Sequence, residues 1–217
     1  EVVKQRLRNH PKAKYISVTQ EDNGNYCRCD SCRAALEKMS VSDLLFTFIN
    51  KVAKAVKEEF PDVIVHAFAY SFAMDPPSFQ LESNVAVQYC LNDMCVCHAL
   101  DDPNCPQNVK VSAKIRKWAE KTSYLMIWDY VHCHNIPLLL QPNILYLWRN
   151  FRFLTANKMR GYFAEEGLGF QEGYPALNNL KCYLISKLCW DPDMSYDKFI
   201  EHAEDFLCGY YGKGKTG

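Results

Sequence analysis

The chain alternates between short runs rich in β-branched and aromatic residues and longer stretches whose apolar residues recur at helical spacing. The short runs are nearly continuous in apolar character, which is typical of strands covered on both faces. Strands that alternate with helices predict βαβ units and a parallel sheet, so the expected fold class is α/β. The five predicted strands occupy residues 15–20, 63–70, 84–90, 124–130 and 159–167.

Residues 41–60 carry the clearest helical pattern, with Ser42 as the candidate cap near the start and Pro61 after the end. Residues 90–108 have no period and are rich in Cys, Asp, Asn and Pro, which predicts a long loop. Similar periodicity predicts further helices over residues 2–10, 111–122, 144–157, 176–189 and 195–211.

Composition narrows the class of protein. A chain of 217 residues, 48% of them hydrophobic, is expected to form a single domain over residues 1–217. Lys plus Arg equals Asp plus Glu at 25 each, so no net field favours nucleic acid or an anionic membrane. No apolar stretch reaches the roughly 20 residues that a spanning helix needs. The chain opens without Met, so any secretion signal would have been removed or would lie upstream.

Chemistry in parallel α/β folds sits at the carboxyl ends of the strands. Four of the five predicted strands have an acidic residue at or just after the carboxyl end, and the remaining one ends at Tyr70. The polar and aromatic residues at these ends are Glu21, Asp22, Tyr70, Asn92, Asp93, Asp129, Tyr130, His132, His134, Glu165 and Glu166.

Several carboxylates converging on one mouth are what glycoside hydrolysis needs, because one acid protonates the leaving oxygen while another attacks or activates water. The alternative for any one acid is a helix cap or a solvated surface position. Aromatic rings at the same ends, above all Trp128 beside Asp129, could stack on sugar faces, although single aromatics are more often core residues. These rings are Tyr70, Tyr89, Trp128, Tyr130 and Trp148.

The eleven cysteines favour an oxidising compartment with one thiol left over, and the alternative is a cytosolic protein with buried free thiols. Disulfides between the first and third strand-end loops are favoured. Zinc is the second interpretation, although C-x-C-x2-C is not the paired spacing of zinc ribbons, and free thiols are the third. The candidates are Cys27, Cys29 and Cys32 in one loop and Cys90, Cys95, Cys97 and Cys105 in the other.

His132, Cys133 and His134 look like half of a metal site, but one H-x-H pattern is weak, and pocket-lining histidines are more common. No Gly-rich phosphate loop, Walker pattern or nucleophile elbow occurs, which disfavours nucleotide and serine-hydrolase chemistry. The leading interpretation therefore includes no cofactor and no metal.

An ordered set of motifs covers almost the whole chain and is more specific than any one of them. It resembles the domain of unknown function 4838 family, which is common in secreted proteins of polysaccharide-degrading bacteria. The motifs are SVTQEDNGNYCRCDSC (17–32), NKVA (50–53), HAFAY (66–70), HALDDPNCP (98–106), WDY (128–130), GYFAEEG (161–167), KLCWDPD (187–193) and FLCGYYG (206–212).

The resemblance implies a (β/α)8 barrel related to hexosaminidase and α-glucuronidase-type hydrolases, of which this chain would supply strands four to eight. A partial barrel exposes sheet edges, which an upstream segment, a partner chain or a second copy would cover. By resemblance, Asp22 is the general acid, beside Glu21, and Asp129 and Glu165 supply the second carboxylate or bind sugar hydroxyls. The expected substrate-binding residues are Tyr70, Asn92, Trp128, Tyr130, His132 and Glu166.

The sequence therefore predicts a secreted or extracellular, glycoside-hydrolase-like domain that binds an oligo- or polysaccharide and, if active, hydrolyses its O-glycosyl bonds. Two alternatives stay open. One is a lectin-like or scaffold domain that keeps the pocket without the chemistry, and the other is a zinc-stabilised interaction module.

Overall fold

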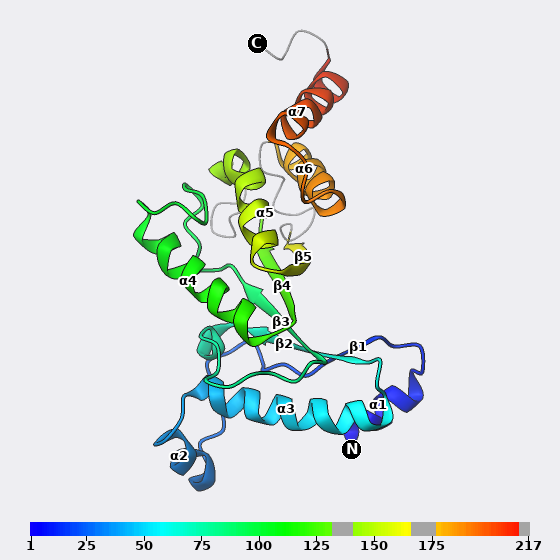
Figure 1. Cartoon of the computed structure of the whole chain (residues 1–217), viewed down its shortest axis with the longest axis vertical. Helices are drawn as coiled ribbons and strands as arrows, with labels where there is room; N and C mark the ends of the chain where they lie inside the picture. The colour runs from blue at the N-terminus through cyan, green and yellow to red at the C-terminus, as the bar shows by residue number, and fades with distance from the viewer. Residues whose placement is uncertain (132–140, 166–176, 213–217) are drawn as a thin grey trace. The chain divides into compact units, whose positions relative to one another are not determined.

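The computed structural model describes residues 1–131, 141–165 and 177–212, and strands alternate with helices in them as the sequence predicts (Figure 1). All five predicted strands are confirmed. The first is shorter than predicted, because its pairing ends soon after Ser17, where the N–H of Val18 donates to the carbonyl of His66 at 2.8 Å. The strands are β1 (Tyr15–Ser17), β2 (Ile64–Ala69), β3 (Val85–Cys90), β4 (Tyr124–Tyr130) and β5 (Met159–Glu165).

The six predicted helices are present as well, with two differences. The short α2 was not predicted, and α4 begins at Pro106, inside the predicted loop, because proline suits the first turn of a helix. Two short 3-10 helices, η1 (Ser71–Ala73) and η2 (Pro142–Tyr146), join longer elements. The α-helices are α1 (Val2–Asn9), α2 (Asp30–Leu36), α3 (Val41–Glu59), α4 (Pro106–Lys121), α5 (Leu147–Ala156), α6 (Asn178–Trp190) and α7 (Tyr196–Tyr211).

The cap of α3 is Ser40, so the prediction of Ser42 was wrong. The Oγ of Ser40 accepts from the N–H of Asp43 at 3.0 Å, and Oδ2 of Asp43 accepts from the N–H of Ser40 at 3.1 Å. This reciprocal capping box satisfies two backbone donors that the helix leaves open. Ser42 lies within the first turn, where its hydroxyl donates to the carbonyl of Asp75 at 2.6 Å.

The five strands form one sheet in the order β1-β2-β3-β4-β5, and the pairs β1–β2, β2–β3 and β3–β4 are parallel. Each strand therefore lies next to the strand that precedes it in the chain. A doubly wound sheet reverses its strand order at a switch point, whereas this sheet does not. When each right-handed crossover adds the next strand at the same edge of the sheet, all the connecting helices lie on one face of it.

Contacts divide the chain into two compact units. The first unit consists of Glu1–Cys90, Ala113–Trp128 and Lys158–Gly161, and the second consists of Leu91–Ser112, Asp129–Asn157 and Tyr162–Gly217. The boundary falls within α4, β4 and β5, which run from one unit into the other. The expected single domain over 1–217 stays a prediction.

In the first unit the two faces of the sheet differ in how far helices bury them. Because side chains alternate along a strand, Val65, Ala67 and Ala69 of β2 share one face, and all three are fully buried. The helix α3 packs against β2 and β3 (Figure 1). On the other face His66 and Phe68 are only half-buried. One face is thus packed under helices, and the other is partly open.

Trp118 of α4 is the largest fully buried side chain of the first unit's core. Its ring lies 5.1 Å from that of Phe46 in α3, and its indole N–H donates to the carbonyl of Met74 at 2.9 Å. This single residue therefore joins α4 to α3 and to the segment that follows β2.

Within the described ranges, no helix is long and apolar enough to cross a membrane.

Candidate functional site

The first predicted carboxylates, Glu21 and Asp22, lie in the loop after β1, and both are exposed. Gln20 anchors this loop, because its Nε2 donates to the carbonyl of Tyr70, at the end of β2, at 2.9 Å. The N–H of Asn23 donates to the carbonyl of Glu21 at 2.8 Å, which closes a tight turn. The two acids therefore stand on an anchored loop where a large molecule in solvent can reach them.

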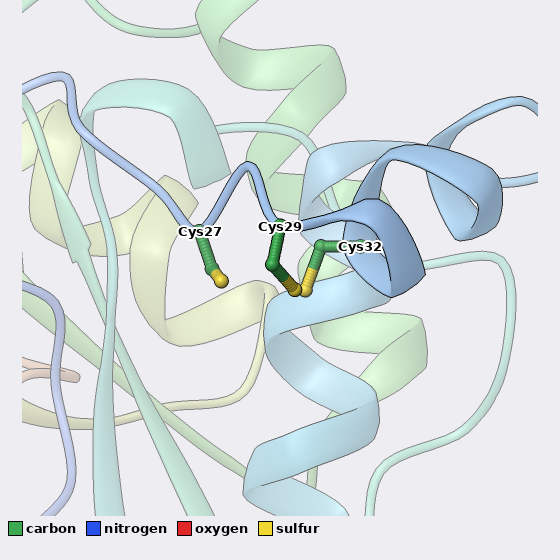
Figure 2. Close-up of side chains that lie close together, drawn as sticks. All are labelled: Cys27, Cys29 and Cys32. Atoms are coloured by element: carbon green, nitrogen blue, oxygen red, sulfur yellow. The ribbon is translucent and has the colours of Figure 1, made fainter.

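Cys27, Cys29 and Cys32 follow in the same loop, and their sulfur atoms lie within 4.8 Å of one another. Figure 2 shows the three side chains pointing toward one another, with Cys29 at the entry to α2 and Cys32 inside that helix. A hydrogen bond from the backbone N–H of Cys32, followed by bonds from the neighbouring thiols, lowers the pKa of Cys29. The thiols of Cys27 and Cys29 raise the pKa of Cys32 to about 11. The pKa values of Cys29 and Cys32 therefore both depend on the neighbouring thiols.

Trp128 and Phe68 meet on the partly open face of the first unit, with ring centroids 5.5 Å apart in an edge-to-face arrangement. Beside them His66 bridges two strands: its Nδ1 lies 3.2 Å from Oγ of Ser17, and its Nε2 lies 2.7 Å from Oε1 of Gln88. Burial lowers the pKa of His66, against the hydrogen bond to Gln88. The face is therefore aromatic and polar, unlike the aliphatic face under α3.

In the second unit Asp129 is buried, with 5% of its surface exposed. The hydroxyl of Tyr162 donates to its Oδ2, and its Oδ1 has no hydrogen-bond partner within the described residues. Burial raises the pKa of Asp129 against the hydrogen bond from Tyr162 and the nearby charge of Lys181. A carboxyl group that keeps its proton to higher pH can donate a hydrogen bond or a proton.

Lys181 of α6 was not predicted, although it is only 2% exposed. Its Nζ donates to the carbonyl of Val131, just after β4, and to Oε1 of Gln141 at 2.9 Å. Burial lowers the pKa of Lys181 to about 8, despite the nearby carboxyl of Asp129. Asp129 near the end of β4, half-buried Tyr162 of β5 and buried Lys181 of α6 together form one polar cluster.

The remaining predicted residues are more scattered. Asn92 is exposed in the loop after β3, and Tyr130 and Glu165 are half-buried at the ends of β4 and β5. The N–H of Val131 donates to the carbonyl of Glu165 at 3.1 Å, so these two strand ends lie side by side. His132 and Glu166, with Cys133 and His134, lie outside the described residues. That all predicted site residues line one pocket stays a prediction.

A second group, Cys95, His98 and Cys105, also has its ligand atoms within 4.8 Å. Cys95 Sγ lies 3.2 Å from Nδ1 of His98. The buried side chain of Asn108 organises this loop: its Oδ1 accepts from the N–H of Cys95 at 2.8 Å, and its Nδ2 donates to the carbonyls of Cys95, His98 and Ala99. Sequence spacing alone does not single out Asn108.

Among the described residues the cysteines stand as thiols and not as disulfides, the exposed Cys97 and Cys189 among them. The predicted disulfides between the two loops stay a prediction. The structure adds that Cys27, Cys29 and Cys32 gather in the first loop, and that Cys95 and Cys105 gather with His98 in the second.

The pH dependence of stability tests the buried state of Asp129. The pKa of this carboxyl group is higher in the folded protein than in the unfolded chain. Its contribution to the free energy of unfolding is therefore fully present below the unfolded-state pKa, and it is lost as the pH rises through the folded-state pKa. Asp129→Asn, which keeps the acceptor for Tyr162, should therefore match the wild type at low pH and exceed its stability at neutral pH. Urea unfolding between low and neutral pH measures this difference. Parallel stability curves for the two proteins would contradict it, and Asp30→Asn, at an exposed acid, is the control.

Comparison with known proteins places the chain in a family. The family model described as "Domain of unknown function (DUF4838)" matches residues 1–215. The chain belongs to this family. The resemblance drawn from the ordered motifs is thereby confirmed, and the α/β class with its parallel sheet is confirmed by the fold of this DUF4838 chain.

One solved structure similar to this DUF4838 chain is the crystal structure of β-N-acetylhexosaminidase from Bacteroides fragilis NCTC 9343, with 16% sequence identity and a TM-score of 0.49. The similarity covers 98% of this chain and 44% of that one, so the DUF4838 chain spans less than half the length of the hexosaminidase. A search of curated proteins finds no match.

Proposed function

We propose that this chain is a secreted, glycoside-hydrolase-like domain that binds a glycan and hydrolyses its O-glycosyl bonds. The observation that carries the proposal is the placement of acids and aromatic rings at the carboxyl ends of a singly wound parallel sheet. Sites in parallel α/β folds lie at those ends, and acids with flanking rings suit a sugar.

The strand order also supports a barrel as the parent architecture. When consecutive strands are always added at the same edge of the sheet, the connecting helices cover one face only. The other face is then covered if the sheet closes on itself as a barrel. On that face of the first unit His66, Phe68 and Trp128 are half-buried, whereas the residues of β3 between them are buried. In this proposal the strands correspond to strands four to eight of a (β/α)8 barrel, and an upstream segment, a partner chain or a second copy supplies the rest.

The proposed chemistry divides among three carboxyl groups. Asp22 is the general acid, which its exposure makes accessible to a polysaccharide. Asp129 and Glu165 supply the second carboxylate or hold sugar hydroxyls. The buried environment that raises the pKa of Asp129 supports this role, because perturbed carboxyl groups cluster at functional sites.

A glycan screen tests the proposal. The purified chain is applied to an array of plant, bacterial and animal glycans, and each ligand found is then incubated with the protein while released sugar is measured. We expect binding to at least one glycan class and release of its sugar. Binding without release would favour the lectin-like alternative. Failure to bind any glycan would overturn the proposal.

A further inference from the structure

Three thiols converge in the loop after β1, on a segment that holds no disulfide in the structure. Cys27 and Cys29 are exposed and Cys32 is half-buried, and their sulfur atoms lie within 4.8 Å of one another (Figure 2). Tetrahedral zinc with thiolate ligands at about 2.3 Å separates its sulfurs by about 3.8 Å. The observed grouping therefore needs only a small contraction to hold the ion.

The loop is held in this shape by contacts other than the thiols. The ring of Tyr26 lies 5.4 Å from that of Phe72, and Gln20 ties the start of the loop to the end of β2. The N–H of Arg33 donates to the carbonyl of Cys29 at 2.9 Å, which holds Cys29 at the start of α2. Metal sites use such contacts around their ligands to orient them.

The charged side chains next to the three sulfurs are compatible with a bound cation. The guanidinium of Arg28 lies over the ring of Tyr26 at 5.1 Å, and that of Arg33 pairs with Asp30 at 2.9 Å. Both neighbouring cations therefore have other partners. A bound divalent cation favours the thiolate form of the sulfurs that ligate it.

A disulfide fits the arrangement less well. One disulfide would join two of the sulfurs and leave the third beside it, whereas the three sulfurs here are grouped together. Soft thiolate ligands select zinc over the hard cations that prefer oxygen.

We propose that Cys27, Cys29 and Cys32 bind one Zn²⁺ ion as three thiolates, with water as the fourth ligand. Binding forms three Zn–S bonds and releases the three thiol protons to solvent. The ion would fix the loop that presents Glu21 and Asp22, and it does so whether or not the domain acts on a glycan. This inference is therefore independent of the proposed function.

The second group, Cys95, His98 and Cys105, must be separated from this one in any test. It lies in the other unit of the chain, and Asn108 organises its loop. A variant in each group, combined with a variant at a cysteine outside both, assigns any bound zinc to its ligands.

The test is zinc content and cobalt absorption of the full chain. Reduced protein is loaded with Zn²⁺, passed through metal-free buffer and analysed for metal, and Co²⁺ then replaces zinc so that thiolate-to-cobalt charge transfer reports sulfur ligation. Four variants are compared with the wild type: Cys29→Ser and Cys27→Ser in the proposed site, Cys95→Ser in the second group, and Cys189→Ser at an exposed thiol outside both.

We expect Cys29→Ser and Cys27→Ser each to lose one equivalent of zinc and the matching cobalt absorption, while circular dichroism shows an intact fold. Cys95→Ser and Cys189→Ser should keep that equivalent. Zinc content unchanged in both Cys29→Ser and Cys27→Ser would overturn the proposal. The proposal would also be overturned if the wild-type protein bound no zinc. The same holds if the mass of protein purified without reductant showed these thiols joined as a disulfide.

Discussion

Replacing Asp22 by Asn should lower kcat/KM on a cleaved glycan by roughly a hundredfold to ten-thousandfold, the range that a positioned general acid contributes. The amide keeps the shape of the side chain but supplies no proton to the leaving oxygen. Because Asp22 is exposed in an anchored loop, the fold and the free energy of unfolding should stay close to those of the wild type. Initial rates on the best glycan of the screen, together with thermal unfolding, measure both quantities.

The matched control is Asp30→Asn, which removes an exposed acid from the same loop region where it pairs with Arg33. Its turnover should equal that of the wild type. Wild-type turnover in Asp22→Asn would remove this residue from the acid role. Equal losses in both variants would point instead to a general effect of charge in the loop.

Replacing Trp118 by Ala should lower the free energy of unfolding by about 3–5 kcal/mol, the usual cost of truncating a fully buried tryptophan. The variant opens a cavity beside Phe46 and leaves the carbonyl of Met74 without the indole donor. Chemical unfolding followed by circular dichroism measures the change.

Trp190→Ala is the matched control, because Trp190 is 90% exposed at the end of α6. It should change the free energy of unfolding by less than about 0.5 kcal/mol. Similar losses in the two variants would contradict the assignment of Trp118 to the core that joins α3 and α4.

The fold class could be predicted because its signal is local. The run over 63–70 shows strand composition and the stretch 41–60 shows helical spacing, and both are visible in a window of a few residues. Boundaries were less predictable. Ser40 and Ser42 are both capping residue types near the start of α3, and only the three-dimensional pairing of Ser40 with Asp43 decides between them.

The candidate site could be predicted only where a residue follows its strand directly. Asp129 was found because it stands at the end of a predicted strand. Tyr162 and Lys181, which surround it, come from β5 and α6, and no pattern in the sequence links them to Asp129. Such contacts depend on how distant elements pack, which spacing along the chain does not encode.

The cysteines show the same limit. Their spacing left disulfides, zinc and free thiols open, because connectivity cannot be read from one sequence. The structure brings Cys27, Cys29 and Cys32 together within their own loop. That local convergence, rather than the number of cysteines, favours zinc over a bridge to the third strand-end loop.

If a glycan binds at the carboxyl ends of the parallel strands, hydrogen exchange of the full chain with and without a saturating glycan will detect it there. We expect slower exchange in the loop over residues 18–26 and in the segment after β2, with little change in α3. Protection confined to helices such as α3 or α7, with the strand-end loops unchanged, would contradict it.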